Sequence, residues 1–222
     1  MQVPIIAVID IFPALLHGTW ITIQVTLGAI ALACAASTAA ALCRLSGNPA
    51  LSWPARIYIE FFRGTSALVQ LFWTFYVLPF SGINIGPLTS AIIVLGLNGG
   101  AYGSEIIRGA VSAIPQGQRD AATALNLPRF SRIFGIMTPQ ALPLILPPLT
   151  NLFIDILKNS ALAGLVTVGD LTFQAQVLRE STPASGYIFG VVMLIYFALA
   201  ICMSMAMRWL ESRVNFPRGG RL

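Results

Sequence analysis

Long, unbroken apolar runs constrain this chain more than any other feature of its sequence. Five windows bounded by charged residues, proline or glycine reach the ~20 residues that a helix needs to cross a bilayer. They are residues 19–43, 57–80, 88–107, 142–163 and 187–210. Because their apolar residues are continuous and do not alternate with polar ones, helices are favoured over the strands of a membrane barrel. The sequence predicts an all-α integral membrane protein with about five transmembrane helices, in one domain over residues 1–222.

The amount and placement of charge support this prediction. Of 222 residues 56% are hydrophobic and 9% charged, whereas a soluble domain of this size has far more charge on its surface. Most arginines fall on one side of the predicted spans: Arg44, Arg56, Arg63, Arg108, Arg119, Arg129, Arg132, Arg208, Arg213, Arg218 and Arg221. Since cytoplasmic loops hold the Lys/Arg excess, the N-terminus is predicted outside and the C-terminus in the cytoplasm. The net charge of +5 then follows from topology and gives no reason to expect a nucleic-acid partner.

No residue set in the chain predicts catalysis, metal binding or nucleotide binding. The single histidine, His17, has no companion ligand at metal-site spacing, and the three cysteines lie in or beside apolar runs. The sequence has no GxxxxGK[ST] motif, so any ATP and magnesium must be bound by another chain. We expect no cofactor in this chain and no enzyme activity of its own.

The connection over about residues 109–139 is long for a compact membrane protein, which indicates a structure or a task of its own. Residues 118–125 are rich in helix formers, Asn126 stands where a left-handed C-terminal cap is needed, and Pro128 follows it. Residues 129–136 resume a helical spacing, with Phe130, Ile133, Phe134 and Met137 able to share one face. The pattern predicts a cytoplasmic helix-turn-helix element.

At this loop the sequence resembles the permease subunits of ATP-binding cassette (ABC) importers of the polar amino-acid family. Their signature reads Glu-Ala-Ala, three residues, Gly, nine residues, then Ile-x-Leu-Pro. Here Asp120-Ala121-Ala122, Asn126 and Ile136-Met137-Thr138-Pro139 match that spacing. Asp in place of Glu keeps the charge, and Asn in place of Gly keeps access to left-handed backbone angles. Thr138 in place of Leu has no explanation in the sequence.

The resemblance continues along most of the chain. Four further segments carry it: Leu15-Leu16-His17-Gly18-Thr19, Glu60-Phe61-Phe62-Arg63-Gly64-Thr65, the run from Gly100 to Gly109, and Leu157-Lys158-Asn159-Ser160-Ala161-Leu162. Ser66 departs from the proline that follows the second of these motifs in the family. Within the family, this variant and the Asn159-Ser160 stretch look most like permeases for ectoine-type compatible solutes.

The resemblance implies a type I importer permease in a bacterial cytoplasmic (inner) membrane. It implies a dimer of ATPases, a second permease subunit that is either identical or a sister chain, an extracytoplasmic solute-binding protein, membrane lipid around the spans, and a small polar solute as cargo. The Ala-rich helix would sit in a cleft on the ATPase. The implied coupling residues are Arg119, Asp120, Ala121, Ala122, Asn126 and Pro139. Small side chains at Ala121, Ala122 and Ala124 would allow the close approach.

Polar residues within the predicted spans are candidates for the solute pathway. Asp155 and Lys158 are ionisable groups in an apolar run, which are costly unless paired or facing a wet cavity. Three residues apart, they are either a structural pair or the two groups that bind a zwitterionic solute. The full candidate set is Thr65, Ser66, Gln70, Asn98, Tyr102, Asp155, Lys158, Asn159 and Ser160.

Several smaller predictions remain. Glu60/Arg63 and Glu105/Arg108 are spaced for local ion pairs, with anchoring at the interface or gating as the two possible roles. Glycines 96, 99, 100 and 103 predict close helix packing. The segment 4–16 is expected along the outer interface, and Asp170 is expected exposed on the outer side. An ion-coupled secondary transporter or channel is the alternative function, although the sequence has no internal repeat to support it.

Overall fold

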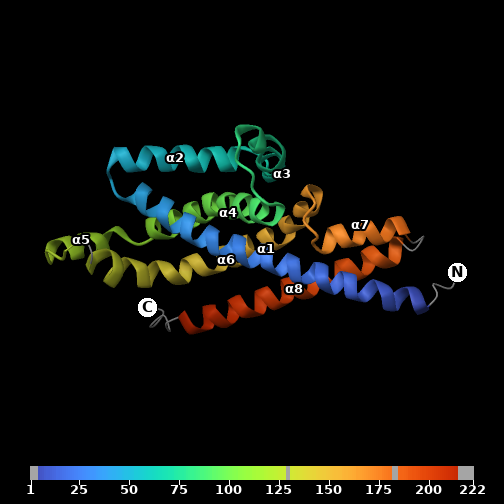
Figure 1. Ribbon diagram of the computed structural model, residues 1–222. Helices are drawn as coiled ribbons and strands as arrows, with labels where there is room; N and C mark the ends of the chain where they lie inside the picture. The colour runs from blue at the N-terminus through green and yellow to red at the C-terminus, as the bar shows by residue number, and fades with distance from the viewer. Residues whose placement is uncertain (1–4, 129–130, 182–184, 215–222) are drawn as a thin grey trace.

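The computed structural model describes residues 5–128, 131–181 and 185–214, and these residues form helices with no strand among them (Figure 1). Four stretches of the described chain are long and apolar enough to cross a bilayer: Phe12–Leu45, Pro87–Ser112, Ser131–Val166 and Ser185–Val214. They belong to helices α1 (Ile5–Leu45), α4 (Pro87–Ser112), α6 (Thr138–Asn159) with its flanking turns, and α8 (Ser185–Val214). Four of the five predicted windows therefore lie in long membrane-type helices.

The first helix is longer than its apolar window. Helix α1 runs for 41 residues and continues through Pro13 without a break. Residues 5–16 belong to the same helix as the window at 19–43, so the segment expected along the outer interface begins that helix, and its place relative to the membrane stays a prediction. A proline inside a membrane helix is tolerated where neighbouring groups satisfy the freed backbone.

The second predicted window, residues 57–80, is wrong as one continuous helix. Helix α2 (Pro49–Gly64) ends at a glycine, and Thr65 and Ser66 have extended backbone angles. The chain then forms α3 (Ala67–Phe72), a π-helical turn η1 (Trp73–Val77) and a 3₁₀ turn η2 (Leu78–Ser81). A hydropathy window measures composition and does not detect such a break.

Glycines hold α1 and α4 close together, as predicted from their spacing. A Cβ atom at Gly100 would lie 2.6 Å from the Cβ of Ala36, and one at Gly96 would lie 2.8 Å from the Leu32 side chain. The phenol of Tyr58 in α2 donates a 2.6 Å hydrogen bond to the Leu97 carbonyl of α4. Helix α4 is therefore the central helix, against which α1, α2 and α6 pack.

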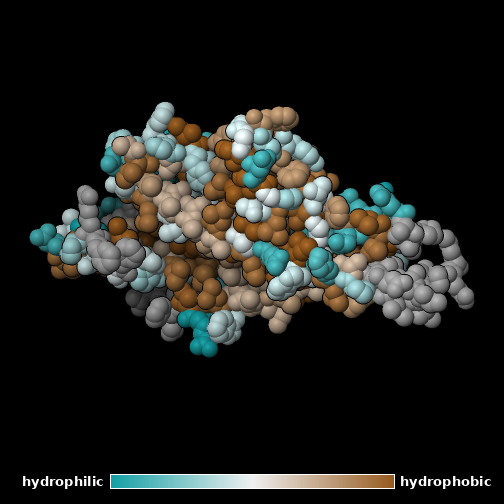
Figure 2. Space-filling view, viewed as in Figure 1, coloured by the Kyte–Doolittle hydropathy of each residue, from teal (hydrophilic) through white to brown (hydrophobic). Residues whose placement is uncertain are grey.

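The elements sort to two ends of the molecule. Helix α5 (Gln116–Ala124), the α1–α2 connection and the last described turns of α8 lie at one end, and the start of α1 and helix α7 (Leu171–Ser181) lie at the other (Figure 1). Apolar side chains cover much of the face between them (Figure 2). Helix α8 has many exposed apolar residues, including Met193, Leu194 and Phe197. Such a surface suits contact with lipid or with another apolar protein face.

Candidate functional site

A cavity of about 490 Å³ lies between the α2–α3 break, α4 and the end of α6. Seven of the nine predicted pathway residues line it: Thr65, Ser66, Asn98, Tyr102, Asp155, Lys158 and Asn159. The first two come from the break, the next two from α4 and the last three from α6. The tertiary structure thus brings together residues that are up to 94 positions apart in sequence.

Asp155 and Lys158 carry opposite charges at this cavity. Both side chains are exposed, and the described residues include no ion pair between them within 4.0 Å. The interpretation of the two as a structural ion pair is therefore wrong in this conformation. A carboxylate and an ammonium that share a cavity wall without pairing can each bind the opposite charge of a ligand.

Gln70 does not line the cavity but supports its wall. Its side chain is 8% exposed, and its Nε2 donates to the Thr65 hydroxyl at 2.7 Å and to the Phe62 carbonyl at 3.1 Å. Asn98 Nδ2 donates to the same carbonyl at 2.9 Å. Because a helix end leaves carbonyls without intrahelical donors, these two amides satisfy the end of α2. The predicted place of Gln70 at the cavity surface is corrected to a place behind it.

Ser160 is also outside the cavity. It is fully buried and donates a 2.7 Å hydrogen bond to the Leu157 carbonyl of its own helix. It directly follows Asn159, but one step along a helix rotates the side chain by about 100° to another face. Sequence proximity to Lys158 and Asn159 is the reason that the prediction included it.

The two Glu-x-x-Arg patterns have different structures. Glu105 and Arg108 form the predicted pair, with Arg108 Nη2 at 2.7 Å from the carboxylate, and Arg44 of α1 approaches the same carboxylate at 3.9 Å. Glu60 and Arg63 form no ion pair within 4.0 Å among the described residues; instead the Arg63 guanidinium lies 5.4 Å from the ring centroid of Tyr102. Because Tyr102 lines the cavity, this cation–π contact places a second cation, after Lys158, beside it. Nothing in the sequence indicated it.

The predicted cap at Asn126 is confirmed. Asn126 has φ of 49°, Leu127 N–H bonds to the Ala122 carbonyl at 3.2 Å, and Asn126 N–H bonds to the Thr123 carbonyl at 2.9 Å. This pair of bonds ends α5 in a Schellman motif, which requires a left-handed residue at that position. The residue that replaces the family's glycine therefore has the backbone geometry of a glycine cap.

The exposed side of α5 differs from the prediction at one residue. Asp120, Ala121 and Ala124 are exposed, whereas Ala122 is 1% exposed and packs within the chain. Pro139 is exposed in the first turn of α6. The side chain of Arg119 lies outside the described part of the structure. The surface that this helix can offer a partner thus includes Ala121 and Ala124 but not Ala122.

The second limb of the predicted helix-turn-helix continues into a membrane helix. Its described part, η3 (Ser131–Met137), joins α6 directly, so one helical run extends from Ser131 to Val166. The expected face of Phe130, Ile133, Phe134 and Met137 cannot be placed as a set, since Phe130 and the Phe134 side chain lie outside the described residues. This run connects η3, which contacts α5, to the cavity residues at the far end of α6.

Asp170 was expected to be solvated, but it is fully buried where α7 begins. Its Oδ1 accepts a 2.9 Å hydrogen bond from Phe173 N–H, and the nearby Leu171 N–H donates to the Thr22 hydroxyl of α1 at 3.1 Å. Burial raises the pKa of Asp170 to about 6, although the Phe173 N–H acts in the opposite direction. The position of Asp170 one residue before a helix is an N-cap pattern that could have identified this role.

Comparison with known proteins gives one consistent family. A family profile described as binding-protein-dependent transport system inner membrane component matches residues 29–216. The probable amino-acid ABC transporter permease protein y4tF of Sinorhizobium fredii is 41% identical over 211 residues, covering 92% of this chain and 89% of that protein. The glutamine transport system permease protein GlnP of Escherichia coli is 32% identical, covering 97% and 99% of the two chains. The L-cystine transport system permease protein TcyB of Bacillus subtilis is also 32% identical, covering 92% and 88%.

Solved structures agree with the sequence comparison. A chain in the crystal structure of an amino acid ABC transporter with histidines superposes with a TM-score of 0.87 at 31% identity, covering 96% of this chain and all of that one. A chain of the inward-facing MetNI methionine ABC transporter superposes with a TM-score of 0.76 at 20% identity and supports the fold alone.

Proposed function

This chain belongs to the family of binding-protein-dependent transport system inner membrane components, and we propose that it imports a polar amino acid or an amino-acid-like solute. Members of this family are transport subunits that work with a separate ATPase and a solute-binding protein, so the chain is not an enzyme. The resemblance stated from the sequence motifs and the type I importer fold are confirmed. The identity of the substrate, the subunit composition of the transporter and the orientation of this chain in the membrane are proposals.

One observation carries the choice of substrate class: Asp155 and Lys158 share one cavity without pairing. A zwitterionic amino acid has a carboxylate for the ammonium of Lys158 and an ammonium for the carboxylate of Asp155. Hydrogen-bonding groups at Thr65, Asn98 and Asn159 complete a polar wall. A few directed polar groups in a cavity are what orients a small ligand.

The helical run from Ser131 to Val166 supports a mechanism for coupling. We propose that the ATPase binds the exposed face of α5 at Asp120, Ala121 and Ala124. Movement of α5 would then displace η3 and α6, and with α6 the side chains of Asp155 and Lys158. A rigid helix transmits such a displacement along its length, as in other rigid-body transitions.

The assembly that follows from this mechanism has two permeases and two ATPases. A second permease, identical or a sister chain, would complete the walls of the cavity that α4, α6 and the α2–α3 break begin. We propose that the α5 end faces the cytoplasm of a bacterial cell and the α7 end faces the binding protein. The excess of arginines at the α5 end supports this orientation.

ATP-driven uptake by the purified permease, ATPase and binding protein in proteoliposomes tests the proposal. Lys158→Met should lower uptake by at least tenfold, while membrane assembly and basal ATP hydrolysis stay unchanged. Arg208→Met, which removes an exposed cation from α8, is the matched control and should transport normally. Unchanged uptake by Lys158→Met would reject the site.

The narrower substrate prediction has a separate test. Equilibrium binding of amino acids and of ectoine to the cognate binding protein would distinguish the two solute groups, because that protein captures the cargo first. The ion-coupled transporter or channel is not favoured, since this family depends on a binding protein. Uptake that persists without ATP and depends on an ion gradient would support that alternative function.

A further inference from the structure

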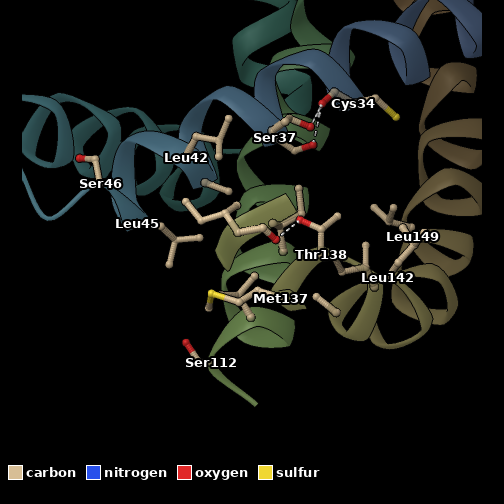
Figure 3. Close-up of a pocket in the computed structure, with 17 residues that line it drawn as sticks. Cys34, Ser37, Leu42, Leu45, Ser46, Ser112, Met137, Thr138, Leu142 and Leu149 are labelled. Atoms are coloured by element: carbon tan, nitrogen blue, oxygen red, sulfur yellow. Dashed lines mark hydrogen bonds between the residues drawn. The ribbon is translucent and has the colours of Figure 1, made fainter. Parts of the chain in front are cut away.

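A second cavity, of about 660 Å³, lies where the ends of α1 and α4 diverge and η3 and the first turns of α6 face them (Figure 3). It shares no lining residue with the solute cavity. It is at the α5 end of the molecule, between residues 34–46 at the end of α1 and just beyond it, 107–112 of α4, and 133–149 of η3 and α6. Nothing in the proposed transport function uses it.

The wall of this second cavity suits hydrocarbon and not a polar solute. Leu, Ile, Val, Met and Ala side chains make most of it, and none of its lining residues is charged. Its hydroxyls are largely occupied: Ser37 and Thr38 donate to the Cys34 carbonyl at 3.1 and 2.8 Å, and Ser46 donates to the Cys43 carbonyl at 2.8 Å. A polar solute entering here would lose hydrogen bonds to water without replacing them.

Two arginines lie one helical turn from the wall of this cavity. Arg44 follows the lining residue Ala41 by three positions in α1, and Arg108 precedes the lining residue Val111 by three positions in α4, so each is next to a lining residue on its helix surface. Both contact the carboxylate of Glu105, which also lies within electrostatic range of Arg63. Three guanidinium groups against one carboxylate leave a local charge of +2. The Arg108 side chain is 40% exposed, so this charge is open to an anion.

Arg132 is a further donor close to the wall residues in sequence. It directly precedes the lining residue Ile133, and its Nη2 donates to the Leu127 carbonyl at 3.3 Å. Its Nε is buried and has no hydrogen-bond partner among the described residues. An unpaired buried guanidinium N–H is costly, and an anionic oxygen is its strongest acceptor.

We infer that this cavity binds an anionic phospholipid, with one acyl chain against the apolar wall and the phosphate beside Arg44 and Arg108. A bilayer surrounds the helices with acyl chains, so hydrocarbon contact alone gives no selectivity. Selectivity must come from the headgroup, because each Lys or Arg near the surface favours anionic lipid by an amount equal to roughly a fivefold change in affinity. Basic pockets between membrane helices recognise lipid headgroups by this chemistry.

Lipid retention by the purified full chain tests the site. Dioleoylphosphatidylglycerol and dioleoylphosphatidylcholine are added separately to the protein in detergent, and bound lipid is counted by native mass spectrometry. We expect about a tenfold preference for phosphatidylglycerol, and Arg108→Gln should remove most of it. Arg208→Gln is the matched control, since Arg208 is exposed at the same end but on α8.

A second measurement tests the apolar part independently of the arginines. Cys34 is exposed and lines the cavity, so in a Cys43→Ser, Cys202→Ser background its maleimide labelling reports occupancy. Phosphatidylglycerol should slow this labelling severalfold. Thr38→Phe fills the cavity from an exposed position and should abolish retention, whereas Ala35→Phe, exposed on the same helix but not lining it, should not.

Several outcomes would overturn the inference. Equal retention of the two lipids, or equal loss of preference in Arg108→Gln and Arg208→Gln, would mean that overall surface charge is responsible. Competition by soluble glycerol phosphate at the same concentration would mean that a free phosphate, and no acyl chain, is bound. Normal retention by Thr38→Phe would place the lipid elsewhere.

Discussion

Gln70 donates a 2.7 Å hydrogen bond to the hydroxyl of Thr65 across the break between α2 and α3. The same amide reaches the Phe62 carbonyl at 3.1 Å, which in a continuous helix would accept from the N–H of Ser66. Asn98 of α4 joins this group from the other side. The break is therefore held in a defined geometry by side chains, and Thr65 and Ser66 become part of the wall of the solute cavity.

The first prediction concerns this break. Gln70→Leu keeps the side-chain volume but removes the amide's hydrogen bonds to the Thr65 hydroxyl and the Phe62 carbonyl. We expect the free energy of unfolding to fall by about 1–3 kcal/mol and uptake to fall with it. Thermal unfolding in detergent and proteoliposome uptake measure the two effects. Gln24→Leu, on an exposed position of α1, is the control, and an equal unfolding temperature for both variants would contradict the role of Gln70.

The second prediction separates two neighbouring alanines of α5. Ala121→Trp adds bulk at an exposed position, so the permease should stay folded while its ATPase association falls at least tenfold. Ala122→Leu adds bulk at a position that is 1% exposed, so it should lower stability by about 1–3 kcal/mol. Co-purification of the ATPase and thermal unfolding distinguish the two, with Ala121→Ser as the conservative control. Normal ATPase binding by Ala121→Trp would remove α5 from the proposed interface.

The third prediction concerns the contact of α4 with α1. Alanine at Gly100 places a Cβ 2.6 Å from Ala36 Cβ and 2.8 Å from the Tyr58 hydroxyl, and neither can move far. Gly100→Ala should lower the free energy of unfolding by about 1–3 kcal/mol. Gly109→Ala lies in the same helix with no atom within 4 Å, so it should be neutral or stabilising by up to about 1 kcal/mol. Denaturation of both variants measures the difference; equal effects would show that α1 and α4 separate easily here.

The fourth prediction is a pH dependence from Asp170. Burial raises its pKa from 3.8 to about 6, so between these values the folded protein binds more protons than the unfolded chain. Stability from this group is therefore largest at low pH and is lost as the pH rises towards 6 and above. Asp170→Asn keeps the acceptor for Phe173 N–H and removes the titration.

The measurement for Asp170 is the stability difference between Asp170→Asn and the unmodified protein across pH. The variant should gain relative stability between about pH 4 and pH 7, by an amount of the order of 3 kcal/mol, since one pKa unit corresponds to about 1.4 kcal/mol. Asp120→Asn, at an exposed carboxylate, should show a much smaller change. A constant difference between Asp170→Asn and the unmodified protein would show that Asp170 is hydrated in the folded state.

The lipid-facing helices, the α5 cap and the family could be predicted because each depends on local sequence. Apolar windows identify a membrane helix through its length, and Asn126 followed by Pro128 predicts a helix end through backbone geometry alone. The spacing of the glycines in α4 predicted that another helix packs closely against it, and this too depends only on local sequence. Ranges such as 88–107 needed only small extension, to Pro87–Ser112.

Local sequence could not predict which polar residues meet. Lys158 and Ser160 are two positions apart, yet one lines the cavity and the other is buried against another element. Gln70 was selected for being polar in an apolar run, but only the packing of α3 on α4 decides that it bonds to Thr65 and Asn98. Ala122 was assigned to the ATPase contact by the family resemblance and Asp170 to the outer surface by its place between spans, yet the tertiary structure buries both.

The sequence by itself determined that this chain is a bundle of membrane helices and that helix α5 ends in a cap at Asn126. Helix length, caps and glycine spacing could be predicted because they are properties of neighbouring residues. Only the tertiary structure decided the break in the second span, the unpaired charges of Asp155 and Lys158, and the two separate cavities. Those features depend on which helix faces which, and that is set by packing between segments far apart in the chain.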